Sequence, residues 1–353
     1  MRAVALILGV TACYSPAREG VCSVACTTEC PSGLVCGGDG LCRATDELDC
    51  SSRPDAGDAG DAGVDVPPGE RCFGHDSPPY LRVCLPPAFP LVESLELTGF
   101  TLVETDNDAA CTLLVGPTSG EICVIAAESL AVQSGAVLRA KGVRPLMLLG
   151  ASQLAIRGIV DVASRRGGGV GAGANPPGCK LTNAGQSTGG SVGASGGAGG
   201  SFQGAGGKGG ASVVQLEGGA PDGAMTAATA FRGGCPGGAG GSTAQVGPKG
   251  AAGGGAVYVL TGGMLSFSGT INASGAGGNP AGTQQGGSGG GSGGLIVVES
   301  ATQSIGTTAT AFALGGGGST GGGDTGGGTP GNEPTGPTSF ALRAAGGGGL
   351  GGA

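Results

Sequence analysis

Residues 146–163 read LMLLGASQLAIRGIVDVA, and residues 257–274 read VYVLTGGMLSFSGTINAS. The two stretches align without a gap, and a polar position also matches, since Asp161 meets Asn272. Each has one apolar run followed by two short runs of alternating side chains, which is typical of strands with one buried face. The apolar pairs of the alignment are Leu148 with Val259, Leu154 with Leu265, Ile156 with Phe267, Val160 with Ile271 and Val162 with Ala273.

Two further stretches follow the same pattern, one beginning near Cys123 and a weaker one covering residues 295–314. No helical periodicity accompanies them, because few positions combine helix-forming residues without glycine. The matches of the stretch near Cys123 are Leu130 with Leu154, Val132 with Ile156 and, after a one-residue slip, Gly135 with Gly158, Val137 with Val160 and Leu138 with Asp161.

Stacked copies of such a unit pair the strand edges that each copy leaves open, and they bury equivalent side chains together. We therefore expect an all-β protein, a right-handed parallel β-helix or solenoid. The pattern resembles the right-handed parallel β-helices of bacterial surface proteins. A β-sandwich built from hairpins is the alternative fold.

Glycine supplies 84 of the 353 residues, without the strict three-residue period of collagen. Its tracts at 165–255, 275–294 and 315–353 all follow the same strand of the repeating unit, so we expect them to form one glycine-rich flange beside the β-helix. Ordering so much glycine requires close backbone packing, for which polyproline II bundles are one geometry. Disordered tails are the alternative for 315–353. Glycine-rich bacterial surface proteins of the PGRS type are similar to the tracts in composition.

The N-terminus has a charged start at Arg2, an apolar run over residues 3–10 and small residues before Cys13. It resembles a bacterial lipoprotein signal. The resemblance implies removal of residues 1–12, a lipid on Cys13 and anchoring in a membrane. Tyr14 in place of an aspartate favours the outer membrane or cell surface within the cell envelope. An ordinary secretory peptide, and hence a secreted protein, is the alternative.

Besides Cys13 the chain has twelve cysteines, which fall into two sets of six on either side of a linker. Since there is no CxxC motif and the single histidine, His75, has no partner at ligand spacing, we expect disulfides in an oxidising compartment, and no metal site or cofactor. The disulfide candidates are Cys22, Cys26, Cys30, Cys36, Cys42 and Cys50 in the first set and Cys72, Cys84, Cys111, Cys123, Cys179 and Cys235 in the second.

Two domains joined by a linker follow from these features. Residues 13–50 form a cysteine-rich module that resembles EGF-like and knottin-like modules and needs bridges because it has few apolar residues. It acts as a stapled spacer or, alternatively, as a recognition module. Residues 51–69 repeat an acidic Asp-Ala-Gly triplet and read as an extended linker. Residues 70–353 form the glycine-rich β-solenoid domain.

The net charge of −8 argues against nucleic-acid binding, because the densest basic spot is only the pair Arg165 and Arg166. β-Helix folds also host polysaccharide lyases and glycosidases, which need clustered charged groups on one face. Asp161 has no acidic counterpart in the aligned copies, and Asp106 and Asp108 read as turn residues. Arg139, Arg157 and Arg165 are the candidates for such a face, although a solvated rim is the usual explanation of arginines in this pattern.

A Ser-His-Asp arrangement has only His75 to use, and His75 lies in a predicted loop. We therefore expect a protein that is not an enzyme, with a structural or adhesive role. Its partners would be glycans or other surface proteins, besides the membrane that holds the lipid anchor. A carbohydrate-binding or polysaccharide-degrading protein is the alternative function.

Overall fold

The computed structural model divides the chain into two compact units, Met1–Pro67 and Pro68–Ala353. In the first unit, strands β1 (Val35–Cys36) and β2 (Cys42–Arg43) pair antiparallel. The residues that the structure describes are 35–36, 42–43, 70–75, 80–115, 121–179, 184–187, 193–225, 230–242 and 247–338. Outside them lie the predicted signal peptide 1–12, the predicted lipid site Cys13, the disulfide candidates Cys22, Cys26, Cys30 and Cys50, the linker 51–69 and residues 339–353 of the last glycine tract.

The second unit is built on two sheets. The first has the order β14-β12-β10-β8-β5, all parallel, with β7 added antiparallel to β8. Its long strands are rich in β-branched residues and leucine, as expected for strands buried on both faces. The bounds are β5 (Ser94–Leu97), β7 (Leu113–Val115), β8 (Ile122–Val132), β10 (Leu146–Ile156), β12 (Ala256–Phe267) and β14 (Leu295–Ile305).

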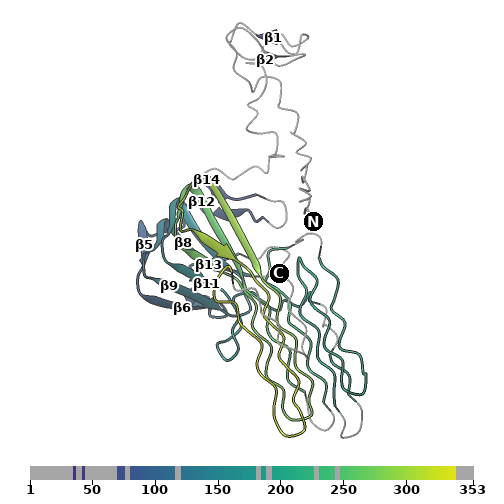
Figure 1. Cartoon of the computed structure of the whole chain (residues 1–353). Helices are drawn as coiled ribbons and strands as arrows, with labels where there is room; N and C mark the ends of the chain where they lie inside the picture. The colour runs from purple at the N-terminus through teal and green to yellow at the C-terminus, as the bar shows by residue number, and fades with distance from the viewer. Residues whose placement is uncertain are drawn as a thin grey trace, which may run out of the picture. The chain divides into compact units, whose positions relative to one another are not determined.

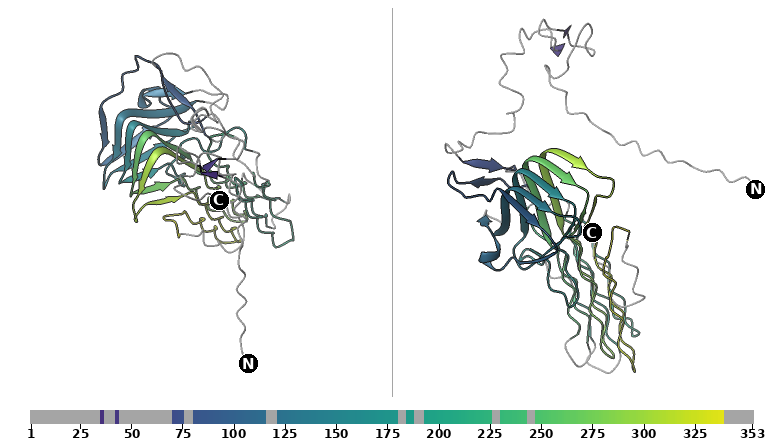
Figure 2. Two further views of the ribbon diagram at one scale, coloured as in Figure 1. Left: turned by 90° about the horizontal axis from the view of Figure 1, so that it is seen from above. Right: turned by 90° about the vertical axis from the view of Figure 1, so that its left-hand side faces the viewer.

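The second sheet has the order β15-β13-β11-β9-β6 and is parallel throughout. Strands β9, β11, β13 and β15 each follow a long strand of the first sheet after a short turn. The chain therefore passes from the first sheet to the second four times in the same way (Figures 1 and 2). The bounds are β6 (Phe100–Glu104), β9 (Val137–Lys141), β11 (Ile159–Asp161), β13 (Thr270–Asn272) and β15 (Thr310–Phe312).

The strand register matches the alignment of 146–163 with 257–274. Leu154 lies beside Leu265 and Val160 beside Ile271, and all four side chains are buried in one core between the sheets. The match with the stretch near Cys123 is correct for Leu130 and Val132 but wrong beyond them. The partners there are Ile159 with Val137, Val160 with Leu138 and Asp161 with Arg139.

The cause is the length of one turn. Four residues, 133–136, separate β8 from β9, whereas two, 157–158, separate β10 from β11. The longer turn has Gly135 at a φ of +78°, where a residue with a side chain would be strained. The register therefore slips by two residues at this turn, and not by one.

The predicted right-handed parallel β-helix or solenoid with a glycine-rich flange is wrong. The strands form two parallel sheets, and in the described residues no strand lies between β11 and β12 or between β13 and β14 to close a coil. The chain returns from the second sheet to the first through glycine-rich segments instead. The alternative, a β-sandwich of hairpins, is also wrong, because neighbouring strands within both sheets are parallel, apart from β7.

The glycine-rich segments run side by side away from the sheets as hairpins, and we call this array the glycine bundle (Figures 1 and 2). Backbone hydrogen bonds join the segments at every third residue. Gly234, Gly237 and Gly240 donate to residues 254, 251 and 248, and Gly197 and Gly200 donate to residues 287 and 290. A three-residue period leaves two-thirds of the backbone groups for other neighbours, so each segment bonds to several others.

Glycine is required because the segments approach each other too closely for a side chain. A Cβ on Gly289 would lie 1.8 Å from the carbonyl oxygen of Ala198, and one on Gly197 would lie 2.2 Å from that of Gly238. Both distances are shorter than any van der Waals contact, so the bundle depends on the absence of side chains there.

A second core lies on the outer face of the first sheet. Met147, Leu149 and Tyr258 are buried there beneath Phe202 and Phe231 of the glycine-rich region. A hairpin of β3 (Arg71–Phe73) and β4 (Val83–Leu85) covers part of the same face. The two cores explain why the long strands are apolar on both faces.

Candidate functional site

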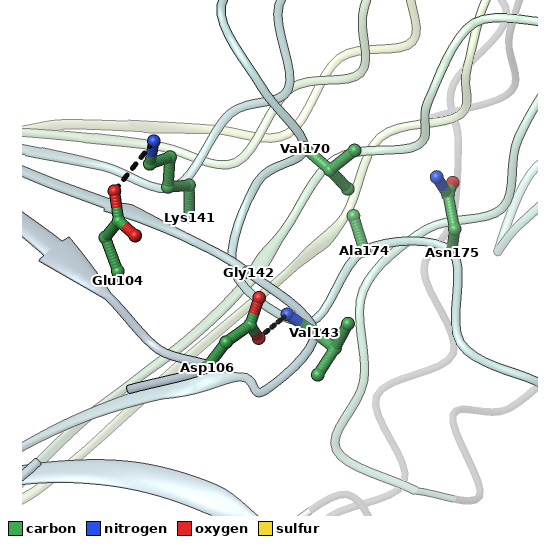
Figure 3. A pocket seen from close by; sticks show the side chains of 8 residues that line it. All are labelled: Glu104, Asp106, Lys141, Gly142, Val143, Val170, Ala174 and Asn175. Atoms are coloured by element: carbon green, nitrogen blue, oxygen red, sulfur yellow. Dashed lines mark hydrogen bonds and ion pairs between the residues drawn. The ribbon is translucent and has the colours of Figure 1, made fainter. Parts of the chain in front are cut away.

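A cavity of about 430 Å³ lies where β6 and β9 end together (Figure 3). Because the two strands are parallel neighbours, their last residues, Glu104 and Lys141, stand side by side and form an ion pair of 2.9 Å. This pair forms one wall of the cavity. The residues that line the cavity are Glu104, Asp106, Lys141, Gly142, Val143, Val170, Ala174 and Asn175.

The turns that follow these two strands form a second wall. Asp106, in the turn after β6, accepts a hydrogen bond of 2.5 Å from the amide of Val143, in the turn after β9 (Figure 3). Gly142 has a φ of +129°, and a Cβ there would lie 2.5 Å from the hydroxyl of Thr105. The chain therefore needs glycine to bring the two turns together.

The remaining wall comes from the beginning of the long glycine tract. Gly142 donates to the carbonyl of Val170, and Gly173 donates back to the carbonyl of Gly142, which holds this loop against β9. Asn175 has a φ of +55° and its side-chain oxygen accepts from the amide of Gly253 at 2.8 Å. Val170 and Ala174 give the cavity an apolar floor between its polar walls (Figure 3).

Both carboxylates of the lining already have partners. Glu104 pairs with Lys141, and Asp106 accepts a hydrogen bond from a backbone amide. The described residues of the lining include one ammonium, two carboxylates and one carboxamide. Mixed polar groups over a small apolar floor suit a ligand that carries hydroxyl groups beside a carbon skeleton.

Arg144 fixes the turns behind this cavity. Its guanidinium contacts Asp108 at 2.5 Å and Glu121 at 2.6 Å, and donates to the carbonyl of Thr105 at 3.1 Å. The hydrogen bond that Arg144 donates to Asp108 is the main reason why the pKa of Arg144 is raised. Asp108 begins the short 3-10 helix η2 (Asp108–Ala110), so its role is structural, as the turn prediction for Asp106 and Asp108 implies.

The arginines proposed as a sugar-binding face do not point at one common position. Arg139 donates to the carbonyl of Gly168 at 2.9 Å, Arg157 donates to the side chain of Gln133 at 3.2 Å, and Arg165 pairs with Asp161 at 2.7 Å. Each cation therefore has its own local partner. In the ladder of the second sheet, Asp161 lies between Arg139 and Asn272.

Arg166, which follows Arg165 in the sequence, forms hydrogen bonds with several segments of the glycine bundle. Its guanidinium donates to the carbonyls of Gly278 and Gly331, and its amide bonds to the carboxylate of Glu333. These bonds join the segment that follows β11 to segments more than a hundred residues later in the chain. The arginine pair is thus engaged within the protein.

His75 has a partner that the sequence does not reveal. Its imidazole contacts the carboxylate of Glu299, which also accepts a hydrogen bond from the hydroxyl of Tyr258. Burial, and then the bond to Glu299, raise the pKa of Tyr258. Only the pairing of β12 with β14 brings Tyr258 and Glu299 together, so no local motif could identify this cluster.

The second set of six cysteines pairs completely. The disulfides are Cys72–Cys84, Cys111–Cys123 and Cys179–Cys235. Among the described residues, Glu70, Cys72 and Cys84 bring three potential metal-ligand atoms close together. Both sulfurs are joined in a disulfide, so neither is a free thiolate that could bind a metal. Three disulfides indicate an oxidising compartment, extracellular or in the cell envelope.

In the described residues, no helix has the length and apolar character that crossing a membrane requires. Comparisons with protein-family models, with curated proteins and with solved structures found no match to the chain. Function therefore has to be argued from the geometry of this chain alone.

Proposed function

We propose that this is an exported cell-envelope protein, anchored through a lipid on Cys13, with a structural or adhesive role and no catalysis. The glycine bundle is the observation that carries the proposal. Backbone hydrogen bonds at every third residue make it a stiff array, and its glycines at the closest contacts leave no room for a side chain. Such an array is suited to hold its outer turns at a fixed place away from the sheets.

One of these turns offers a contact surface. Gly210, just before it, is bonded to Gly196, and the chain then reverses at 212–215, where Ser212 and Leu216 bond to each other. Val213 and Val214 lie in this turn with exposures of 85% and 42%. Two adjacent β-branched apolar residues on a closed turn are poor turn formers, so we assign them to contact with another protein surface.

Attachment of cells that display the protein tests the adhesive role. We expect the double variant Val213→Ser, Val214→Ser to reduce attachment to a surface coated with cells of the same kind. Val92→Ser is the matched control, because Val92 is 52% exposed but lies outside the bundle. Equal attachment of cells with and without the protein would refute the role.

Export and anchoring need their own test. Labelling with a radioactive fatty acid should mark the wild-type protein and leave Cys13→Ser unlabelled, and fractionation should place only the wild type in the membrane. Recovery of the wild-type protein from the cytosol with reduced thiols would contradict the proposal, whatever the attachment assay shows.

The cavity in Figure 3 supports a second candidate function, glycan binding without hydrolysis. The supporting observation is its mixed lining of one ammonium, two carboxylates and one carboxamide above Val170 and Ala174. We expect Glu104→Gln and Lys141→Gln to weaken binding on a glycan array, and Lys208→Gln to leave it unchanged, since Lys208 forms an exposed ion pair with Glu217 elsewhere. No binding by the wild type on such an array would exclude this candidate.

A further inference from the structure

Both sheets of the second unit end in free edges. β5 and β14 lie at the two ends of the first sheet, and β6 and β15 lie at the two ends of the second (Figure 1). In the described part of the chain, no strand pairs with the outer edge of any of these four. None of the four contains lysine, arginine or proline, which natural proteins place on edge strands to prevent pairing with another chain. These edges are therefore open to strand addition.

The core between the sheets is incomplete at both of these ends. Ile305 of β14 lies beside Phe267 in the ladder, on the same face of the sheet. Phe267 is 7% exposed, whereas Ile305 is 54% exposed. At the opposite end, Leu95 and Leu97 of β5 are only partly buried against the same core. A further pair of strands would therefore bury apolar surface at either end.

The hydrogen bonds of β5 show which of its backbone groups face outward. The carbonyls of Glu93, just before the strand, and of Leu97, at its end, both accept from β8. In a parallel ladder alternate residues bond to opposite sides, so the amides and carbonyls of Ser94 and Glu96 face the free edge.

The same argument applies to β14. Gly306, directly after the strand, donates to the carbonyl of Phe267 in β12. The amides and carbonyls of Gln303 and Ile305 therefore face the free edge.

A second copy of the chain, shifted along the sheets, presents β5 to β14 with the same strand direction. The register that joins their outward groups places Ile305 beside Leu97 of the second copy, and both side chains then face the core. In this register the amide of Ile305 meets the carbonyl of Glu96. Two residues earlier, Gln303 meets Ser94 in the same way.

The turns to the second sheet fit the same register. Residues 306–309 separate β14 from β15, as 133–136 separate β8 from β9, and in both turns the last amide donates to the first carbonyl. Residues 98–99 separate β5 from β6, as 157–158 separate β10 from β11. Within the chain, β8 pairs with β10 and β9 with β11, so a turn of four already lies beside a turn of two. The same arrangement between copies brings β15 beside β6.

We propose that this protein assembles head to tail with further copies of itself. β14 and β15 of one copy add to β5 and β6 of the next as parallel strands, and Ile305 is buried against Leu97 of that copy. Because the two contact surfaces differ, each assembly keeps one free edge of each kind and can grow into a filament. The inference is independent of the adhesive and glycan-binding proposals, because it concerns neither the bundle turns nor the cavity of Figure 3.

Proline variants of the full chain test the proposal. Gln303→Pro and Glu96→Pro each remove one outward amide and spare the bonds within the sheet, as proline on an edge strand does. Gln303→Thr and Glu96→Thr keep the amide and are the matched controls. A Cys13→Ser background excludes association through a lipid. Unaltered hydrogen exchange of β10, at the centre of the first sheet, checks that each variant is folded.

Sedimentation velocity over a series of concentrations measures the assembly. We expect the wild type and the threonine controls to form dimers and longer species as the concentration rises, and each proline variant to stay monomeric. An equal mixture of the two proline variants should form dimers and nothing longer, because each partner supplies the edge that the other lacks. In the wild type, the amides of Gln303 and Ile305 should exchange on the order of tenfold more slowly in the assembly than after dilution.

Two results would overturn the proposal. One is a wild type that stays monomeric at every concentration, with exchange at Gln303 and Ile305 that does not depend on dilution. The other is association of either proline variant alone to the extent of the wild type. That outcome would place the contact between two identical edges or at another surface.

Discussion

Asp161 and Asn272 lie side by side in the second sheet and perform the same task where each strand passes into glycine. The side-chain oxygen of Asp161 accepts from the amide of Ala163 at 3.2 Å, and that of Asn272 accepts from the amide of Ser274 at 3.0 Å. Phe312 occupies the equivalent position in β15, and there Leu314 donates to the hydroxyl of Ser274 instead. Each exit from the sheet thus has one side-chain oxygen for the same amide.

Replacing either residue by alanine should therefore weaken the fold. Asp161→Ala and Asn272→Ala each leave a buried amide without its acceptor, which costs about 1–3 kcal/mol of unfolding free energy. Asp161→Asn keeps the acceptor oxygen, as Asn272 does, and should retain more stability than Asp161→Ala. Urea denaturation measures the difference, with Asp324→Ala, at an exposed position, as the control. Equal stability of Asn272→Ala and wild type would show that the turn holds without this bond.

Close packing of the bundle gives a second prediction. Gly289→Ala places a methyl group 1.8 Å from the carbonyl of Ala198, so the segments must separate, at a cost of about 1–3 kcal/mol. Gly326 is the control, because a Cβ there meets nothing within 4 Å. We expect thermal unfolding at a clearly lower temperature for Gly289→Ala and no loss for Gly326→Ala. Similar melting of both variants would mean that the bundle adds little to stability.

Strand positions could be predicted from the sequence because the signal is local and repeated. Alternation at Leu154, Ile156 and Val160 fixes which face is buried, and the gapless match to 257–274 fixes the register. The slip at 133–136 could not be predicted, since two turns of different length both satisfy the apolar pattern. The all-β class is thus correct, whereas the way in which the units connect is not.

The sequence does not predict how the chain returns from the second sheet to the first, because the connecting tracts are rich in glycine and have no pattern of side chains. A tract such as 275–294 has no alternation to mark a strand, and its order comes from backbone bonds to segments far away in sequence, as between Gly197 and Gly287 or Gly289 and Gly238. The cavity of Figure 3 depends on the same segments, so Asn175 carries no sequence signal of its role. The pair of Tyr258 and Glu299 was hidden for a similar reason, because strand pairing alone brings them together.

The raised pKa of Tyr258 gives a prediction at alkaline pH. Unfolded tyrosine loses its proton near pH 10, whereas folded Tyr258 keeps it to higher pH. The stability that this group contributes is therefore complete below about pH 10 and is lost as the pH rises above it, by up to about 1.4 kcal/mol per pH unit.

Urea unfolding at pH 8 to 11.5 measures this loss, and Tyr258→Phe, which does not titrate, is the reference. We expect the stability difference between wild type and Tyr258→Phe to shrink with increasing pH. Absorbance at the tyrosinate band should show a titration above pH 10 in the wild type that Tyr258→Phe lacks. A difference that stays constant over this range would contradict the assigned role of burial and of Glu299.

The disulfides should differ in what they contribute, because they close loops of different length. Cys179–Cys235 spans 56 residues and Cys72–Cys84 spans 12. Loop-closure entropy then predicts that replacing both cysteines by serine costs roughly 4 kcal/mol for the first pair and roughly 3 kcal/mol for the second. The longer loop lies in the glycine-rich region, whose unfolded chain is the most flexible part of the protein.

Denaturation of the two double-serine variants measures both values, and exchange of bundle amides adds a local readout. Cys179→Ser with Cys235→Ser should speed exchange throughout 231–241 and 247–255, whereas Cys72→Ser with Cys84→Ser should affect the hairpin of β3 and β4 and leave the bundle protected. If removing Cys72–Cys84 costs more stability than removing Cys179–Cys235, native contacts rather than loop length determine how much each disulfide contributes. The glycine segments would then be held by their backbone bonds alone.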